Sequence, residues 1–165
     1  MTPAQRANFQ RLLTPQHVAV IGGRDAEIAL TECVRSGYQG AIWPVNPKRD
    51  SIKGYDCFNS VHDLPEAPDA VFLAVPASVA VGIIDALAKM GAGGIVCYTA
   101  GFAEAGQADA QKALIDAAGD MALIGPNCYG MINYLDKVAL WPFTHGGKCP
   151  GFGAAIITQS GMLSS

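Results

Sequence analysis

The sequence has few charged residues, no cluster of basic residues and no long uninterrupted hydrophobic run. Charged residues make up 15% of the 165 positions, hydrophobic residues make up 50%, and the formal net charge is −3. Because nucleic-acid binding depends on basic side chains that neutralise phosphates, we expect no nucleic-acid partner. Pro, Gly or charged residues interrupt the apolar runs well short of the ~20 residues that span a bilayer, so we expect no membrane segment.

The cysteines lack the spacing of a metal site or of a disulfide framework. Their number is odd, no two of them form a CxxC pair, and they are scattered over positions 33, 57, 97, 128 and 149. This pattern predicts reduced thiols and no metal site. The N-terminal stretch also lacks the basic region and apolar core of a signal peptide, so we expect a cytoplasmic protein.

Short β-branched hydrophobic runs alternate along the chain with segments of helical periodicity. Alternation of this kind predicts right-handed crossovers, and therefore an α/β fold with a doubly wound parallel sheet of the Rossmann type. Residues 1–16 read as a short helical lead-in. The predicted strands are 17–22, 40–46, 69–75, 93–99 and 121–125, and the predicted helices are 25–37, 77–91 and 107–119.

The pattern loosens after the fifth predicted strand. We expect the Rossmann-like domain to cover residues 17–148, with an irregular connector from about residue 126. Residues 153–161 then read as one more buried strand that enters a small polar loop. A loop of this kind normally precedes a helix. We therefore interpret residues 149–165 as the truncated start of a second βα domain.

Ligands of open parallel sheets bind beyond the carboxyl ends of the strands, so the segments that follow the predicted strands are the candidate site. We expect all of them to meet at one edge of the sheet. They are Gly22-Gly23-Arg24, Asn46-Pro47-Lys48, Pro76-Ala77, Ala100-Gly101-Phe102 and Gly125-Pro126-Asn127-Cys128.

The first of these turns matches a dinucleotide-binding turn only in part. Gly22 and Gly23 are adjacent, the third glycine of that motif is missing, and Asn46 stands where a site for NAD requires an acidic residue. Lys48 suits a ribose phosphate, as in NADP or coenzyme A. A tight turn without any ligand and a solvated lysine are the alternatives, and the residues alone leave them open.

Five motifs in this order resemble the N-terminal coenzyme A-binding domain of the nucleoside-diphosphate-forming acyl-CoA synthetases, which is similar to the succinyl-CoA synthetase α subunit. The resemblance covers roughly residues 17–165. The first turn departs from it, because it reads GGRD where many relatives have Gly-Ala-Ser-Arg. The motifs are VAVIGG, IWPVNPK, AVP, AGFAEAG and GPNCYGMIN.

The resemblance implies a ligase that converts an acid, CoA and a nucleoside triphosphate into an acyl-CoA, a nucleoside diphosphate and phosphate. It implies a phosphorylated histidine in a second domain, and ATP or ADP with magnesium in domains that this chain lacks. The implied partners are a carboxylic acid or its acyl-CoA and the remaining synthetase domains or subunit. A homo-oligomeric full-length enzyme is also implied, and the fragment alone is expected to be inactive.

The resemblance also implies roles for residues of the candidate edge. Asn127 and Cys128 would lie at the thiol end of CoA, where acyl transfer occurs, and Gln159, Ser160 and Gly161 resemble the loop that receives the phosphohistidine. The residues expected to bind CoA are Gly22, Gly23, Arg24, Pro47, Lys48, Val75, Pro76, Ala100, Gly101, Phe102 and Asn127.

Several alternatives stay open at this point. The same sheet would suit an NADP-dependent oxidoreductase, a redox sensor or a stand-alone CoA-binding regulator. Cys128 has the alternative role of a small buried hydrophobe, and Glu104 that of a solvated carboxylate. His145 lies beside glycines, but the resemblance puts the phosphohistidine elsewhere. Trp141 packs in the core or borders an acyl pocket.

Overall fold

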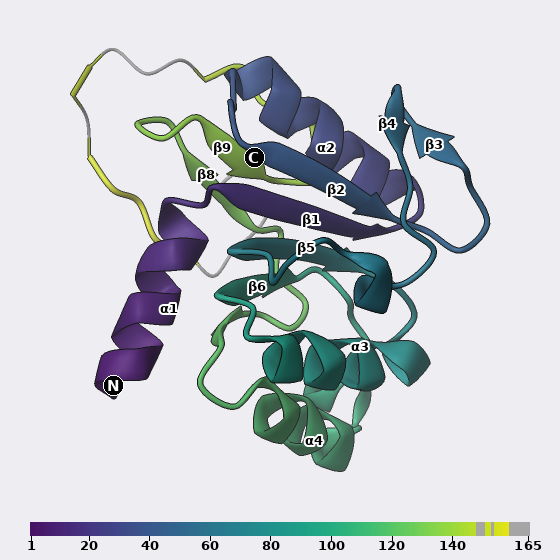
Figure 1. Ribbon diagram of the computed structural model, residues 1–165. Coiled ribbons are helices and arrows are strands. Elements are labelled where there is room, and N and C mark those ends of the chain that lie inside the picture. The colour runs from purple at the N-terminus through teal and green to yellow at the C-terminus, as the bar shows by residue number, and fades with distance from the viewer. Residues whose placement is uncertain (148–150, 153, 159–165) are drawn as a thin grey trace.

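The chain folds around a parallel sheet with helices on both faces, which confirms the predicted doubly wound α/β class. The structure is a computed structural model that describes residues 1–147, 151–152 and 154–158. In this part of the chain the five strands of the sheet lie in the order β2-β1-β5-β6-β7 (Figure 1). These strands are β1 (His17–Gly22), β2 (Ala41–Val45), β5 (Ala70–Ala74), β6 (Gly94–Cys97) and β7 (Ala122–Ile124).

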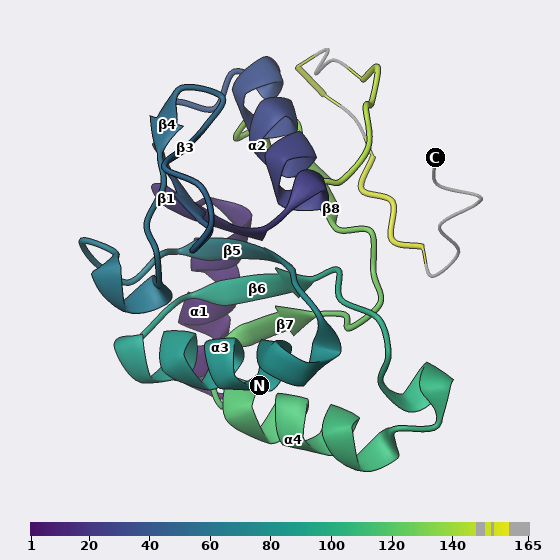
Figure 2. The same cartoon turned by 90° about the vertical axis from the view of Figure 1, so that its right-hand side faces the viewer.

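Four α-helices of the described residues cover the sheet in two layers (Figure 2). The first two helices pack on one face, and the other two pack on the opposite face. The order of the strands reverses between β1 and β5, and ligands of open α/β sheets bind at such a switch point. The helices are α1 (Pro3–Leu13), α2 (Arg24–Ser36), α3 (Ala77–Met90) and α4 (Ala108–Ala118).

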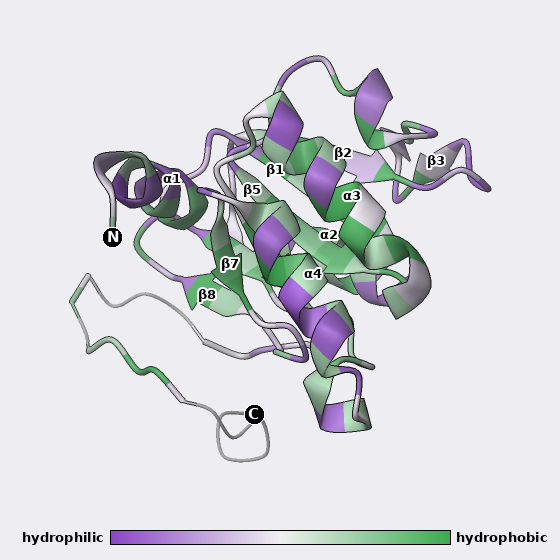
Figure 3. Ribbon diagram, turned by 90° about the horizontal axis from the view of Figure 1, so that it is seen from below, coloured by the Kyte–Doolittle hydropathy of each residue, from purple (hydrophilic) through white to green (hydrophobic). Residues whose placement is uncertain are grey.

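The strands are hydrophobic on both sides because helices bury both faces of the sheet. Val20 and Phe72 belong to the cluster under α1 and α2, whereas Ile21 and Leu73 belong to the cluster under α3 and α4. At most 3% of any of these four residues is exposed. Continuous apolar runs of this kind are typical of parallel strands. Figure 3 shows the resulting contrast between apolar strands and the hydrophilic outer stripes of α3 and α4.

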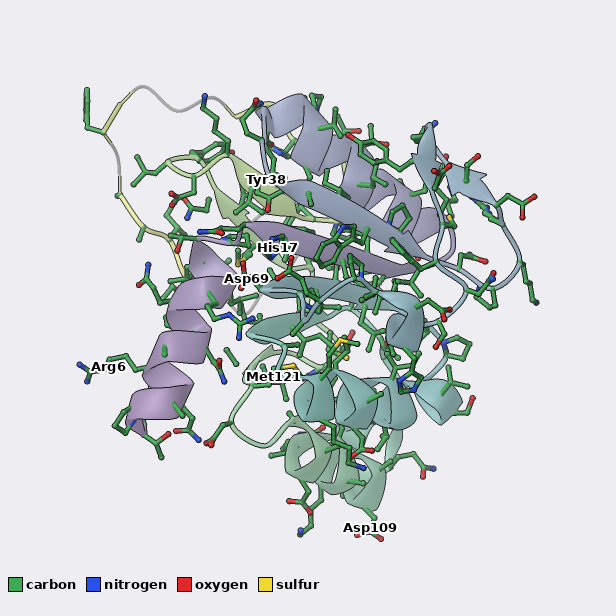
Figure 4. All side chains as sticks on the ribbon, in the orientation of Figure 1. Arg6, His17, Tyr38, Asp69, Asp109 and Met121 are labelled. Carbon is green, nitrogen blue, oxygen red and sulfur yellow. The ribbon has the colours of Figure 1, made fainter. Side chains whose placement is uncertain are left out.

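Helix α1 is fixed to the amino end of the sheet. Arg11 Nε donates to Asp69 Oδ1 at 2.7 Å, and Asp69 Oδ2 accepts from the backbone amide of Gln16 at 2.8 Å. His17 lies beside Asp69 where α1 meets the sheet (Figure 4). The predicted lead-in helix is confirmed, and its Leu12 is completely buried. Because α1 covers the amino end, the carboxyl ends of the strands face away from it.

The prediction of an irregular connector is wrong for residues 131–140. This segment forms an antiparallel hairpin of β8 (Met131–Asn133) and β9 (Val138–Leu140), and every residue of β9 is fully buried. The Cys33 thiol of α2 donates to the carbonyl of Ala139 at 3.0 Å. The hairpin therefore continues the apolar layer beside α2. Its strands have only three residues each, too few for a recognisable period of two.

Shorter elements complete the described residues. The turn-rich stretch after β2 forms a small hairpin of β3 (Ser51–Ile52) and β4 (Tyr55–Asp56), followed by the 3-10 helix η1 (Val61–Asp63). The 3-10 helix η2 (Ala103–Ala105) precedes α4. Among the described residues, no helix has the length and apolar character needed to cross a bilayer.

The predicted strand at 153–161 is wrong where the structure describes it. Residues 154–158 form no strand, and Ile156 and Ile157 are 84% and 97% exposed. An apolar run becomes a buried strand only when neighbouring strands and helices cover it, and the described part of the chain does not cover these two side chains. The remaining positions of that segment, 153 and 159–161, lie outside the described residues.

The hairpin should contribute measurably to stability. Leu140→Ala removes a fully buried side chain, and we expect the free energy of unfolding to fall by about 2–5 kcal/mol in urea titrations. Leu135→Ala is the matched control, because Leu135 lies in the same hairpin and is 73% exposed. Its effect should stay within about 0.5 kcal/mol. Equal effects of the two substitutions would contradict a structural role for the hairpin.

Candidate functional site

Hydrogen bonds join the carboxyl ends of neighbouring strands into one continuous edge. The Asn46 side chain forms the first link: its Nδ2 donates to the carbonyl of Gly22 at 2.8 Å, and its Oδ1 accepts from the amide of Lys48 at 2.9 Å. Asn46 therefore ties the end of β2 to the end of β1 and orients the turn that carries Lys48. A carboxylate at this position has no proton to donate to Gly22. The sequence alone marks Asn46 only as the absence of an acidic residue.

The first turn requires glycine at its first position. Gly22 has a φ of +139°, and a Cβ there would lie 2.1 Å from the carbonyl oxygen of Ala74 on β5. The two strands can approach this closely only because Gly22 has no side chain. Gly23 follows as the N-cap of α2 and provides no side-chain hydrogen bond to the first turn of the helix. The amides of that turn therefore face the edge without a side-chain cap, as at helix ends that bind anions.

Thr99 forms the second link along the edge. Its side chain is almost completely buried, and the hydroxyl donates to the carbonyl of Val75 at 2.9 Å and accepts from the amide of Val75 at 3.3 Å. Its own carbonyl accepts from the amide of Asn127 at 3.0 Å. One residue thus holds the ends of β5, β6 and β7 in register. Thr99 was not among the predicted site residues, although a hydroxyl at the end of a buried apolar strand is a signal that could have identified it.

Basic side chains gather around the first turn of α2. Arg49 Nη1 lies 2.8 Å from Glu27 Oε2, and Lys53 Nζ lies 3.2 Å from Glu27 Oε1. These hydrogen bonds from Arg49 and Lys53 lower the pKa of the Glu27 carboxyl group. Arg24 and Lys48 are exposed, and the described residues include no ion-pair partner for either. Arg49 and Lys53 were missed because their partner Glu27 lies far away in the sequence: Arg49 belongs to the turn after β2, and Lys53 to the turn of the β3–β4 hairpin.

The loop after β6 is held by Glu104. Glu104 Oε1 accepts from the amides of Gly101 at 2.6 Å and Phe102 at 3.3 Å, and these hydrogen bonds, chiefly that from Gly101, lower the pKa of Glu104. The Phe102 side chain is fully buried in the core under α3 and α4. Phe102 can therefore contribute only its backbone to a ligand. Glu104 is thus an exposed loop carboxylate, as one alternative expected, and its hydrogen bonds to the amides of Gly101 and Phe102 hold this loop.

The turn after β7 separates the roles of Asn127 and Cys128. A Cβ at Gly125 would lie 2.5 Å from the carbonyl oxygen of Cys97, so glycine allows the turn to fold back onto β6. Cys128 Sγ donates to the carbonyls of Ile124 at 3.3 Å and Cys97 at 3.5 Å, and burial raises the pKa of Cys128 to about 12. A neutral thiol of this kind favours packing over nucleophilic chemistry. Asn127 is exposed beside it.

His145 lies outside this edge. Its Nε2 is 3.4 Å from Glu32 Oε2 in the second half of α2, and its Nδ1 is buried without a hydrogen-bond partner among the described residues. Burial lowers the pKa of His145, despite the nearby Glu32 carboxylate. The geometry favours a structural role, in which His145 attaches the segment after β9 to α2.

The structure brings together the turns that follow all five strands, as sequence analysis expected. The predicted loop of Gln159, Ser160 and Gly161 lies outside the described residues. Within the described part of the chain, no group of three His, Cys, Asp or Glu side chains could hold a metal ion. The cysteines described there are free thiols. Two cavities of about 350 and 360 Å³ lie elsewhere, one between α3 and α4 and one at the amino end.

Comparisons with known proteins agree with this architecture. A family model described as a CoA binding domain matches residues 16–134. A trans-feruloyl-CoA synthase from an unknown prokaryotic organism is 38% identical over 95% of this chain and 24% of its own length. An ADP-forming acetate–CoA ligase from Methanocaldococcus jannaschii is 32% identical over 90% of this chain and 22% of its own length.

A solved structure shows the same fold in a larger enzyme. The dinucleotide-forming acetyl-coenzyme A synthetase 1 of Ca. Korarchaeum cryptofilum, in complex with phosphate and ADP, is 28% identical, with a TM-score of 0.77 over 81% of this chain and 30% of that chain. The chain thus spans about a quarter of the length of the curated relatives described above. It belongs to the CoA-binding domain family, in the form found in ADP-forming acyl-CoA synthetases.

Proposed function

We propose that this chain supplies the CoA site of an ADP-forming acyl-CoA synthetase. The observation that carries the proposal is the continuous carboxyl edge, which has unpaired basic side chains at one end and the exposed Asn127 at the other. A CoA molecule has a matching arrangement, with phosphates at one end and a thiol at the other. The Asn46 and Thr99 links keep the two ends of the edge at a fixed separation.

The proposed contacts follow the direction of the edge. Gly22, Gly23 and Arg24 face the adenosine and its phosphates, where the uncapped first turn of α2 favours negative charge. Pro47 and Lys48 hold a ribose phosphate, and Val75 and Pro76 border the cofactor. The backbone of Ala100, Gly101 and Phe102 lines the pantetheine arm, and Asn127 lies near the thiol. A catalytic role for Cys128 stays a prediction that its raised pKa does not favour.

The proposed reaction combines an acid, CoA and ATP into an acyl-CoA, ADP and phosphate. The phosphohistidine, the ATP site and its magnesium ion belong to domains or subunits outside this chain. The domain alone is therefore expected to bind CoA without turnover. The names of the relatives include an aromatic acyl group, feruloyl, as well as acetate and 4-hydroxybutyrate, so names alone do not choose the acid.

A nicotinamide cofactor fits the edge less well than CoA does. The Asn46 side chain stands where a site for NAD has a carboxylate for the ribose hydroxyls, and both of its polar atoms already bond to the backbone. The family match also favours CoA. A stand-alone regulator would use the same edge, but the curated relatives described above are ligases.

Thermal unfolding with and without cofactor tests the proposed function. CoA at a hundredfold excess over its dissociation constant should add roughly 2.7 kcal/mol to the free energy of unfolding. For a domain of this size the unfolding temperature should rise by on the order of 5–10 °C. NADH and NADPH should leave it unchanged. An unchanged unfolding temperature with millimolar CoA, under reducing conditions, would refute the proposal.

Lys48 should distinguish CoA from dephospho-CoA, which lacks the ribose phosphate. Lys48→Ala should weaken CoA binding about tenfold, since a charge-assisted phosphate contact contributes on the order of 1.5 kcal/mol. Binding of dephospho-CoA should change less than about twofold in calorimetry. Lys112→Ala is the control, because Lys112 is exposed on α4 and paired with Asp116, away from the edge. Equal losses for both ligands would exclude the ribose phosphate as the partner of Lys48.

Thr99 should affect binding through the geometry of the edge. Thr99→Val keeps the shape of the side chain but leaves a buried amide and carbonyl of Val75 without their partner, which costs about 1–3 kcal/mol of stability. CoA affinity should fall several-fold in calorimetry, because the turn after β5 loses its hydrogen bonds to the end of β6. Thr99→Ser keeps the hydroxyl and should retain most of the stability and most of the CoA affinity. An equally weak Thr99→Ser variant would contradict this role, because the hydroxyl alone would then not hold the turn after β5.

A further inference from the structure

Four aromatic side chains form a cluster next to the turn that carries Asn127. We name Tyr98, Tyr129, Trp141 and Phe143 the aromatic cluster. The Tyr129 ring meets Phe143 at 4.8 Å and Trp141 at 5.8 Å, both edge-to-face, and the Tyr98 ring lies 6.5 Å away. Trp141 and Phe143 also meet edge-to-face, at 6.2 Å. The four rings therefore form one continuous aromatic surface.

The chain places this cluster at the thiol end of the proposed CoA site. Tyr129 follows Asn127 by two residues, and Tyr98 directly precedes Thr99, whose carbonyl accepts from the Asn127 amide. Trp141 follows β9, which runs back from the amino end toward this edge beside β8. Three different segments thus converge on the position where the thiol of CoA would carry an acyl group.

The cluster has a fixed base and an accessible face. Tyr98 stacks on the buried Phe72 at 5.9 Å, and Trp141 is only 9% exposed. Tyr129 is 37% exposed and Phe143 is 39% exposed. The exposed Tyr129 and Phe143 rings therefore rest on buried side chains and remain accessible to a ligand.

An acyl group of matching chemistry would complete this surface. Aromatic rings prefer edge-to-face or offset stacking, and such pairs contribute binding energy beyond the burial of area. A two-carbon acyl group would leave the Tyr129 and Phe143 rings largely in water. We infer that the aromatic cluster forms one wall of the acyl site and selects acids with a planar aromatic ring. This inference rests on the proposed function, since it assigns the substrate class of the same site.

Calorimetry with three ligands tests the inference on the 165-residue chain. Cinnamoyl-CoA should bind about tenfold more tightly than acetyl-CoA, and acetyl-CoA should bind about as tightly as free CoA. The double substitution Tyr129→Ala with Phe143→Ala should reduce the preference for cinnamoyl-CoA to twofold or less. Its affinity for free CoA should change less than about twofold, because neither ring is expected to contact the cofactor itself.

Phe9→Ala is the matched control. Phe9 is 40% exposed, nearly the same as Phe143, but it lies on α1 at the opposite end of the sheet. The preference for cinnamoyl-CoA should be unchanged in this variant. If the double variant does not fold, Tyr129→Leu keeps apolar volume without an aromatic ring, and it should lose most of the preference.

The possible outcomes separate the inference from the proposed function. Failure of all three ligands to bind would overturn both. Equal affinities of the unaltered chain for cinnamoyl-CoA and acetyl-CoA, with normal CoA binding, would overturn only the inference. In that case the cluster is a contact surface for another part of a larger protein. A preference for cinnamoyl-CoA that persists in the double variant would also overturn the inference, because the cinnamoyl ring would then bind away from the aromatic cluster.

Discussion

The close approach of β1 and β5 at their carboxyl ends is the constraint on which the candidate site depends. A Cβ at Gly22 would lie 2.1 Å from the Ala74 carbonyl oxygen, so a larger residue would separate the two strands or displace the turn. Helix α2 begins two residues later, and its first turn takes its position from this contact. The carbonyl of Gly22 is also the acceptor for Asn46. The close contact between β1 and β5 therefore determines the position of the start of α2 and of the turn that carries Lys48.

The sequence predicted the sheet because each of its strands is buried on both faces. Such strands are short continuous apolar runs, and their glycine-rich turns mark where they end. The β8–β9 hairpin escaped prediction for a physical reason. Its second strand is buried by its position beside α2, as the exposures of Val138, Ala139 and Leu140 show. A strand of three residues is too short to show the alternating sequence pattern that predicts a strand. The opposite error occurred at Ile156 and Ile157, where an apolar run has no cover.

The positions of the site residues were predictable, but several of their roles were not. Topology alone places the turns after parallel strands at one edge. It cannot show that Phe102 points into the core, that Glu104 holds the loop before it, or that Thr99 joins three strand ends. Lys53 reaches Glu27 from the turn of the β3–β4 hairpin, a contact that the sequence does not reveal. Each of these roles depends on a contact with a second residue, and the sequence does not show which residue that is.

In the proposed site, the backbone of the edge recognises CoA and the side chains of the aromatic cluster recognise the acyl group. Along the edge, hydrogen bonds of Asn46 and Thr99 hold backbone segments in place, and the ligand would meet mainly amides and small residues. This arrangement suits a cofactor that is the same for every acid. Three members of the aromatic cluster, Tyr129, Trp141 and Phe143, flank the β8–β9 hairpin, which Cys33 of α2 supports, whereas Tyr98 lies at the end of β6. Substitutions of the exposed Tyr129 and Phe143 would therefore alter the preferred acyl group without moving the strand ends. In such a domain the affinity for CoA and the choice of acid would vary independently.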